Sequence, residues 1–229
     1  RLLGLNPERA PETSYTIGIG SVEEVAANAH AAGQRFGILK LKMDADEGLC
    51  LAMARALRAV SGARLVVDAN CAWSVKQALH LIPALAELGV EWVEQPLAED
   101  DLEGLCYLYQ RSPLPIFADE PVRTVRDIPP LAGCVHGVNI KVMKAGGLRE
   151  ALRMIATARA HGLQVMLGCM VETSLGITAS AHLAPLVDWA DLDGNLTVTN
   201  DPFVGVQVAP GGRLVLPPGP GLGVHPRPR

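Results

Sequence analysis

The chain has 229 residues, of which 49% are hydrophobic and only 4% aromatic, so we expect one large domain with an aliphatic core. Its formal net charge of −4 argues against a nucleic-acid partner, which would favour a basic surface. The sequence contains no apolar run long enough to cross a bilayer and no signal peptide, which argues against a membrane partner. We therefore expect a globular domain with a small-molecule partner.

Five cysteines are scattered along the chain, and none of them forms a C-x-x-C pair: Cys50, Cys71, Cys106, Cys134 and Cys169. We therefore expect neither a disulfide framework nor a structural zinc site, and a cytoplasmic location. A catalytic cysteine is the sharper alternative, but most lone cysteines are small buried hydrophobic residues.

Short β-branched runs alternate along the chain with longer runs rich in Ala and Leu. The predicted strands, in chain order, are Tyr15–Gly20, Ile38–Met43, Arg64–Asn70, Trp92–Pro96, Pro115–Glu120, Gly137–Val142, Gln164–Met170 and Trp189–Gly194. Capping boxes that begin at Ser21 and Ser74, and acidic versions that begin at Asp44 and Asp100, mark helix starts between them.

Eight strands separated by seven helices predict parallel pairing, because parallel strands require long crossover connections. The choice lies between a closed barrel and an open doubly wound sheet. Eight units favour an α/β fold of the TIM type, a (β/α)7β barrel, and no G-x-G-x-x-G follows the first strand to indicate a dinucleotide fold. We place this barrel at residues 15–195 and expect residues 196–229, rich in Gly and Pro, to form an extended C-terminal tail.

Several predicted strands end in charged residues, although strands that are buried on both faces should be almost purely apolar. Five of these charges recur at steps of 26, 26, 25 and 22 residues, each about one strand–helix unit: Lys42, Asp68, Glu94, Asp119 and Lys141. One such residue is usually a helix cap, a surface ion pair or a solvated edge. Five in register indicate one site at the C-terminal rim, where barrels place their active sites.

The three carboxylates in this set, Asp68, Glu94 and Asp119, are the candidate metal ligands. Like-charged carboxylates do not share a dry space without a cation. Because no His or Cys joins them from a neighbouring strand end, the oxygen donors predict Mg²⁺, with Mn²⁺ as an alternative. Four neighbours are expected to surround and orient the site: Lys40, Asn70, Glu120 and Asn139.

Lys42 and Lys141 are the candidate catalytic residues, on strands two and six and thus on opposite sides of a barrel. A lysine acts as a base only when neutral, and a nearby metal ion, a second ammonium group and Lys40 would lower its pKa toward about 7–8. One lysine can then remove an α-proton, giving a metal-stabilised enediolate, while the other returns a proton to the opposite face. This arrangement predicts racemisation or epimerisation.

Five segments together resemble the muconate-lactonising subgroup of the enolase superfamily: Lys40-Leu41-Lys42, Val67-Asp68-Ala69-Asn70, Val93-Glu94-Gln95-Pro96, Ala118-Asp119-Glu120 and Asn139-Ile140-Lys141. The resemblance runs from about Glu12 to Val224. It implies that the three carboxylates bind Mg²⁺ and that the two lysines form the acid–base pair. Lys144, three residues after the second lysine, is interpreted as structural or as a neighbour that supports the site residues.

Two further segments are similar to the dipeptide epimerases of that subgroup, including those that act on L-Ala-D/L-Glu. Asp191-Leu192-Asp193-Gly194 resembles the D-x-D motif that grips the α-ammonium group, so Asp191 and Asp193 are expected to bind substrate. Gly168-Cys169-Met170, with Glu172-Thr173-Ser174, resembles the end of the seventh strand of these epimerases, which lines the substrate pocket. Met170 is therefore a candidate substrate contact, and Thr16 is another. The resemblance implies a Mg²⁺-dependent epimerase that inverts the α-carbon of a dipeptide's C-terminal residue.

Other functions stay open. Within the superfamily these are o-succinylbenzoate synthase/N-acylamino acid racemase and muconate-type cycloisomerase, whose substrates carry no α-ammonium group for Asp191 and Asp193. A catalytically silent truncated barrel is the alternative from another class. Relatives carry an N-terminal α+β capping domain that helps to select the substrate; we expect it to be absent from this chain, with residues 1–14 as its linker. Pro121 departs from the Ser found in many relatives, and a homo-oligomer is not excluded.

Overall fold

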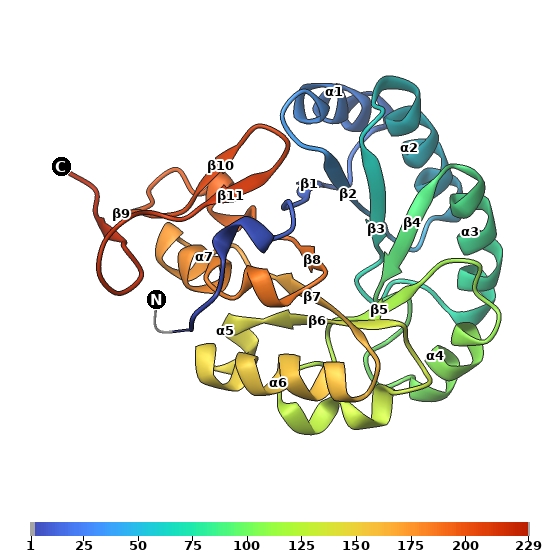
Figure 1. The fold of residues 1–229 in the computed structure, drawn as a ribbon. Helices are drawn as coiled ribbons and strands as arrows, with labels where there is room; N and C mark the ends of the chain where they lie inside the picture. Colours follow the sequence, from blue (N-terminus) through green and yellow to red (C-terminus); the bar gives the residue numbers. More distant parts are fainter. Residues whose placement is uncertain (1–2, 229) are drawn as a thin grey trace.

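The computed structural model describes residues 3–228, so residues 1 and 2 of the predicted linker and residue 229 of the predicted tail lie outside the described residues. Within this range, eight parallel strands form one curled sheet in the order β1 to β8 (Figure 1). The strands are β1 (Tyr15–Ile17), β2 (Ile38–Lys42), β3 (Arg64–Asp68), β4 (Val90–Glu94), β5 (Ile116–Ala118), β6 (Gly137–Lys141), β7 (Gln164–Gly168) and β8 (Trp189–Ala190). The predicted parallel α/β architecture is therefore confirmed.

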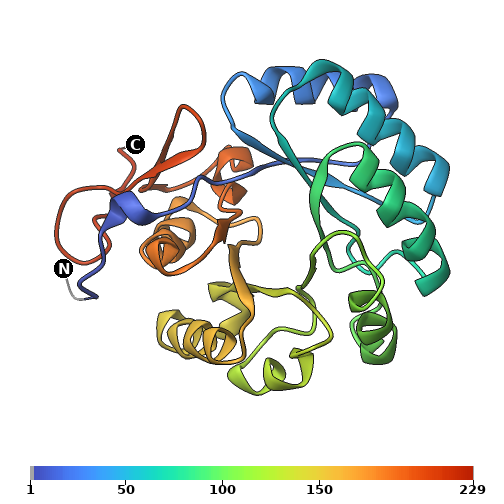
Figure 2. The same cartoon turned by 45° about the vertical axis from the view of Figure 1, so that its right-hand side comes forward.

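Helices cover the outer face of the curled sheet (Figures 1 and 2). They are α1 (Val22–Gly33), α2 (Glu47–Val60), α3 (Val75–Glu87), α4 (Leu102–Tyr109), α5 (Val142–Ala145), α6 (Leu148–Ala160) and α7 (Ser174–Ala181). The capping boxes at Ser21 and Ser74 are confirmed. The predicted caps of α2 and α4 are wrong by one or two residues, because Asp46 and Asp101 accept the hydrogen bonds from the first-turn amides.

The connection between β5 and β6 differs from the prediction of one helix in each of the seven crossovers. In the described chain it contains two short 3-10 helices, η2 (Val125–Asp127) and η3 (Pro129–Leu131), and no α-helix. Pro129 and Pro130 lack the backbone N–H groups that an α-helix would need at these positions. Several predicted strands also end early, because the backbone turns away once the charged residues are reached; β8, for example, stops at Ala190.

The two edges of the curled sheet meet through residues that precede β1. Thr13 forms a parallel bridge with Ala190, and the Ser14 amide donates a hydrogen bond to the Ala190 carbonyl over 2.9 Å. The Leu192 amide donates to Thr13 Oγ1 over 2.7 Å. This seam is consistent with the predicted closed barrel and sets β8 beside β1.

Residues 194–226 follow the seam as one 3-10 helix, η5 (Gly194–Thr197), and four short strands: β9 (Phe203–Val204), β10 (Gln207–Ala209), β11 (Arg213–Val215) and β12 (His225–Pro226). β10 pairs antiparallel with β11, and β9 pairs with β12. The turn of the β10–β11 hairpin touches the start of the chain, since the Thr13 amide donates to the Gly212 carbonyl over 2.8 Å. The segment predicted as an extended tail therefore packs on the seam.

A layer of large apolar side chains, here called the floor, fills the inside of the sheet toward the amino-terminal ends of the strands. It consists of Ile38, Val66, Trp92, Phe117 and Met166, with Trp189 packed against them. The rings of Trp92 and Phe117 lie 4.9 Å apart between centroids. Gly137 has no side chain where the Phe117 ring lies, and a Cβ there would overlap the ring.

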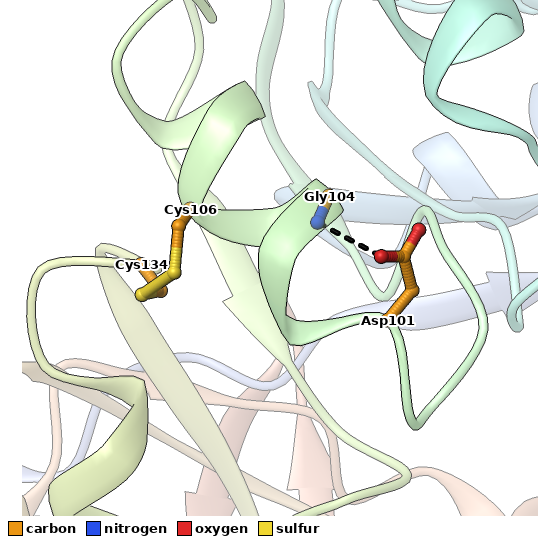
Figure 3. The surroundings of a disulfide bond; sticks show 4 residues. All are labelled: Asp101, Gly104, Cys106 and Cys134. Carbon is orange, nitrogen blue, oxygen red and sulfur yellow. Dashed lines mark hydrogen bonds between the residues drawn. A yellow bond between two sulfur atoms is a disulfide. The ribbon is translucent and has the colours of Figure 1, made fainter.

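Cys106 on α4 and Cys134, just before β6, form a disulfide bond (Figure 3). The expectation of unpaired cysteines is therefore wrong for this pair. The two residues are 28 positions apart, and the fold brings α4 beside the β5–β6 connection, which spacing alone does not reveal. Cys50, Cys71 and Cys169 are free, and none of the described helices is both long and apolar enough to span a membrane.

Candidate active site

The charged residues follow the floor along the same strands. Because side chains alternate along a strand, the residue two positions beyond each floor residue faces the same interior. These next positions are Lys40, Asp68, Glu94, Asp119, Gly168 and Asp191. We call this carboxyl-terminal end of the interior the mouth.

The pairing of the strands aligns the predicted residues in a staggered row. Lys42 pairs with Asp68, and Asp68 pairs with Glu94. Glu94 pairs with Phe117, so that Asp119 lies two residues farther along β5. Such a stagger is expected where strands tilt in a closing sheet, and it keeps the strand ends around one mouth.

A cavity of about 470 Å³ opens at the mouth. Ten of the predicted site residues line it: Thr16, Lys40, Lys42, Asn70, Asp119, Glu120, Lys141, Met170, Asp191 and Asp193. The remaining three, Asp68, Glu94 and Asn139, are fully buried and do not line it. Seven further residues also line the cavity: Tyr15, Arg123, Lys144, Cys169, Val171, Gly194 and Thr197. None was among the predicted site residues, although Cys169 and Gly194 belong to the segments that resemble dipeptide epimerases.

Lys42 lies at the end of β2 and binds the end of β3 and the start of the connection that follows β3. Its Nζ donates to Asp68 Oδ2 over 2.7 Å and to Asn70 Oδ1 over 2.8 Å. Asn70, whose φ is 42°, also donates its backbone amide to Asp68 Oδ1 over 2.9 Å and its Nδ2 to Glu120 Oε1 over 3.2 Å. Burial would raise the pKa of Asp68, but attraction to Lys40 and Lys42 lowers it to about 2.

Lys141 lies at the end of β6, on the opposite side of the curled sheet from β2 (Figure 1). Its Nζ donates to Asp119 Oδ2 over 2.6 Å, and Lys144 Nζ donates to Asp119 Oδ1 over 2.6 Å. Burial would lower the pKa of Lys141, but the Asp119 carboxylate reverses this and raises it. The Asp119 amide is fixed by Gln95 Oε1 over 2.8 Å.

Lys40 and Glu94 form a deeply buried charged pair of the mouth. Lys40 Nζ is 2.7 Å from Glu94 Oε2, an ion pair without hydrogen-bond geometry, while Asn139 Nδ2 donates to Glu94 Oε1 over 2.7 Å. Burial, followed by repulsion from Asp68, raises the pKa of Glu94 to about 8. Burial would lower the pKa of Lys40, but three carboxylates together raise it well above 10.5.

Asp191 and Asp193 follow β8 with different surroundings. Asp191 accepts from Ser14 Oγ over 2.6 Å and from Lys40 Nζ over 2.8 Å. Asp193 accepts from the Thr16 amide over 2.7 Å, and burial, followed by repulsion from Asp191, raises its pKa to about 6. Met170, 48% exposed, stands beside them at the end of β7.

The carboxylates do not surround a common point. Among residues 3–228, no three His, Cys, Asp or Glu side chains converge in a geometry that would hold a metal ion. Asp68 is turned onto Lys42, and Asp119 onto Lys141 and Lys144. The donor chemistry nonetheless fits a hard divalent cation, because three buried carboxylates end consecutive strands and Glu94 Oε2 accepts no hydrogen bond.

Several contacts of the site were not predicted from the residues alone. Ser14 lies one residue before the predicted first strand, although its spacing of two from Thr16 would have placed both on one face. Gln95 holds Asp119 from a strand end with φ of 32°, which strand periodicity does not predict. The interpretation of Lys144 as structural agrees with its bond to Asp119.

This combination defines an α/β protein whose acid–base groups gather at the carboxyl ends of a curled parallel sheet. The chain belongs to the family described as "Enolase C-terminal domain-like", which matches residues 21–229.

Relatives at about 40% identity carry epimerase names. An L-Ala-D/L-Glu epimerase of Bacteroides thetaiotaomicron is 42% identical over 225 residues, which cover 98% of this chain and 58% of that protein. A hydrophobic dipeptide epimerase of Flavobacteria bacterium (strain MS024-2A) is 40% identical over 233 residues, which cover 98% of this chain and 66% of that protein. The chain thus spans roughly three fifths of the length of the curated relatives that it matches.

Solved structures show the same likeness. A dipeptide epimerase from Cytophaga hutchinsonii, complexed with Mg and the dipeptide D-Ala-L-Val, superimposes with a TM-score of 0.93 at 28% identity and covers 99% of this chain and 64% of that one. A substrate-liganded complex of the L-Ala-D/L-Glu epimerase from Bacillus subtilis superimposes with a TM-score of 0.88 at 37% identity. The match covers 94% of this chain and 63% of that one.

Proposed function

We propose that this chain is the catalytic (β/α)7β barrel of a Mg²⁺-dependent dipeptide epimerase. The placement of Lys42 and Lys141 carries this proposal, because strands β2 and β6 bring them to one cavity from opposite sides. The names of the relatives support the choice of dipeptides. In this proposal residues 15–195 form the catalytic unit, and residues 1–14 link it to a preceding capping domain.

Asp68, Glu94 and Asp119 would hold the metal ion. When bound, Mg²⁺ supplies positive charge that stabilises the carboxylate end of the substrate as the α-proton leaves. The ammonium groups of Lys42 and Lys141 now bound to Asp68 and Asp119 would be released toward the substrate.

The two lysines act on one α-carbon from opposite faces. The lysine that accepts the proton is neutral at that moment, and the lysine that returns one is charged. In one direction Lys42 removes the proton and Lys141 donates its own, and the roles reverse for the other enantiomer. Asp193 binds the α-ammonium group at the far end of the dipeptide, since its carboxylate lines the cavity beside Thr16.

The test is proton exchange in D₂O. The full chain with Mg²⁺ and L-Ala-L-Glu, or a panel of other dipeptides, should give inverted product that carries deuterium at the α-carbon, measured by NMR and mass spectrometry. N-succinyl amino acids serve as the matched control because they lack the α-ammonium group. Exchange with these compounds and with no dipeptide would transfer the assignment to an N-acylamino acid racemase. Exchange with neither class would contradict both.

A further inference from the structure

Lys40 stands between the two halves of the mouth and is neither the proton acceptor nor the proton donor of the proposed reaction. Its Nζ is 3.0 Å from Asp68 Oδ2 and 2.7 Å from Glu94 Oε2 on one side, and 2.8 Å from Asp191 Oδ2 on the other. The residue is 1% exposed. One ammonium group therefore joins two candidate metal ligands, on β3 and β4, to the strand end that carries the candidate substrate-binding aspartates.

Asp191 holds this ammonium group rather than facing the cavity freely. Both of its oxygens have protein partners, Ser14 Oγ at 2.6 Å and Lys40 Nζ at 2.8 Å, and the residue is buried. Asp193 contacts neither Ser14 nor Lys40, and its contacts are the Thr16 amide and the more distant Cys169 thiol. The two aspartates of one motif therefore have different partners.

Ser14 links Asp191, and through it Lys40, to the seam. Ser14 also donates its backbone amide to Ala190, so the residue that fixes Asp191 is itself part of the closure between β1 and β8. Lys40 donates one hydrogen bond, to Asp191, and forms ion pairs with Asp68 and Glu94. Buried charges are retained when paired in this way, and removal of one partner leaves the others uncompensated.

We propose that Lys40 is a positioning residue that couples the substrate-ammonium end of the site to its metal end. Through Asp191 it is fixed to the seam, and through Asp68 and Glu94 it orients two of the metal ligands. It touches no reacting atom. This inference rests on the proposed function for the identity of the two ends, but its test does not depend on turnover.

The test changes the partner of Lys40, because replacing Lys40 itself would leave three buried carboxylates without a cation. Asp191→Asn removes a charge that holds Lys40, leaves the ammonium less neutralised beside the metal ligands, and should weaken Mg²⁺ binding about tenfold. Asp193→Asn is the matched control: it removes the same charge from the same motif but does not contact Lys40, and its Mg²⁺ affinity should stay within about twofold of the unchanged protein. Ser14→Ala changes no charge and should weaken Mg²⁺ binding about threefold, the effect of one hydrogen bond.

Mg²⁺ dissociation constants are measured by calorimetry on the full chain without dipeptide, and circular dichroism establishes that each variant is folded. Equal Mg²⁺ affinities for Asp191→Asn and Asp193→Asn would overturn the proposal, as would an unchanged affinity in both Asp191→Asn and Ser14→Ala. Should an Asp191→Asn protein fail to fold, Ser14→Ala alone decides by the same criterion. Mg²⁺ binding without dipeptide exchange would refute the proposed function while leaving this comparison intact. No Mg²⁺ binding by the unchanged protein would refute both.

Discussion

The floor and the mouth are successive layers of one sheet interior, two residues apart on the same strands, and they are built from opposite chemistry. In the floor, Trp92 and Phe117 pack ring against ring with no charge between them. In the mouth, Glu94 and Asp119 follow on the same strands and are held by lysines. Burying these charges is costly unless they are paired, so the apolar layer supplies stability that the charged layer does not.

The difference teaches how the layers depend on each other. The floor closes the interior below the mouth, and the resulting low dielectric strengthens each lysine–carboxylate pair. A change in the mouth should therefore alter chemistry more than stability, and a change in the floor should do the reverse. The following substitutions test this separation.

The largest effect is expected at the lysines of the mouth. Lys42→Ala or Lys141→Ala should lower epimerisation by about 10³–10⁴-fold, because general acid–base catalysis on one face is lost. Each variant should still exchange the α-proton of one enantiomer in D₂O, since the remaining lysine serves its own face. Unchanged turnover in either variant would refute the role assigned to that lysine, and circular dichroism provides the control for folding.

Substitutions in the floor should lower the stability of the protein. Phe117→Ala removes a fully buried ring and should lower the free energy of unfolding by about 3–5 kcal/mol, measured by urea denaturation. Phe117→Leu, which keeps most of the apolar volume, is the control and should cost less. A loss below about 1 kcal/mol for Phe117→Ala would mean that the floor does not carry the stability assigned to it.

The disulfide lies outside both layers and should change stability only. Cys106→Ser, or reduction of the unchanged protein, should lower the free energy of unfolding by about 3–4 kcal/mol for a loop closed by 28 residues. Thiol alkylation with and without reductant, followed by mass spectrometry, measures the bond directly. Detection of five alkylated cysteines in the non-reduced, unfolded protein would contradict this bond.

The smallest effect concerns pH and Asp193. Burial, together with repulsion from Asp191, raises its pKa to about 6, and the ionised form is the one that binds an ammonium group. KM for the dipeptide should therefore rise as the pH falls through 6, reaching about tenfold at pH 5. Because its pKa is higher in the folded protein, Asp193 contributes to the free energy of unfolding at low pH. This contribution is lost as the pH rises from about 4 to 6. In Asp193→Asn the low-pH rise in KM should disappear; persistence of the rise would assign it to another group.

The sequence predicted much of this layout because two periods are visible in it. The strand–helix period gave the parallel sheet, and the alternation within strands placed Lys42, Asp68 and Lys141 on inward positions. The partners of those side chains were not predictable. Lys42 and Lys141 each bind a carboxylate instead of standing free, because a buried charge takes the nearest opposite charge.

Other features escaped because they depend on contacts between distant segments. Ser14 lies outside the periodic strand, and its partner Asp191 is 177 residues away. Cys106 and Cys134 meet only once α4 and the β5–β6 connection are packed together. The 3-10 helices between β5 and β6 contain Pro129 and Pro130, which disfavour an α-helix. The regular strand–helix repeat nevertheless led to the prediction of an α-helix in this connection.

The seam has a consequence for how the polypeptide is made. β1 finds its second neighbour only when Ala190 is available, and Thr13 gains its contact with the hairpin only when Gly212 has been synthesised. During translation this edge therefore stays unpaired until the residues around Ala190 have left the ribosome. An exposed strand edge is a place where a second chain can pair, so the nascent protein is open to aggregation at this edge until the seam forms.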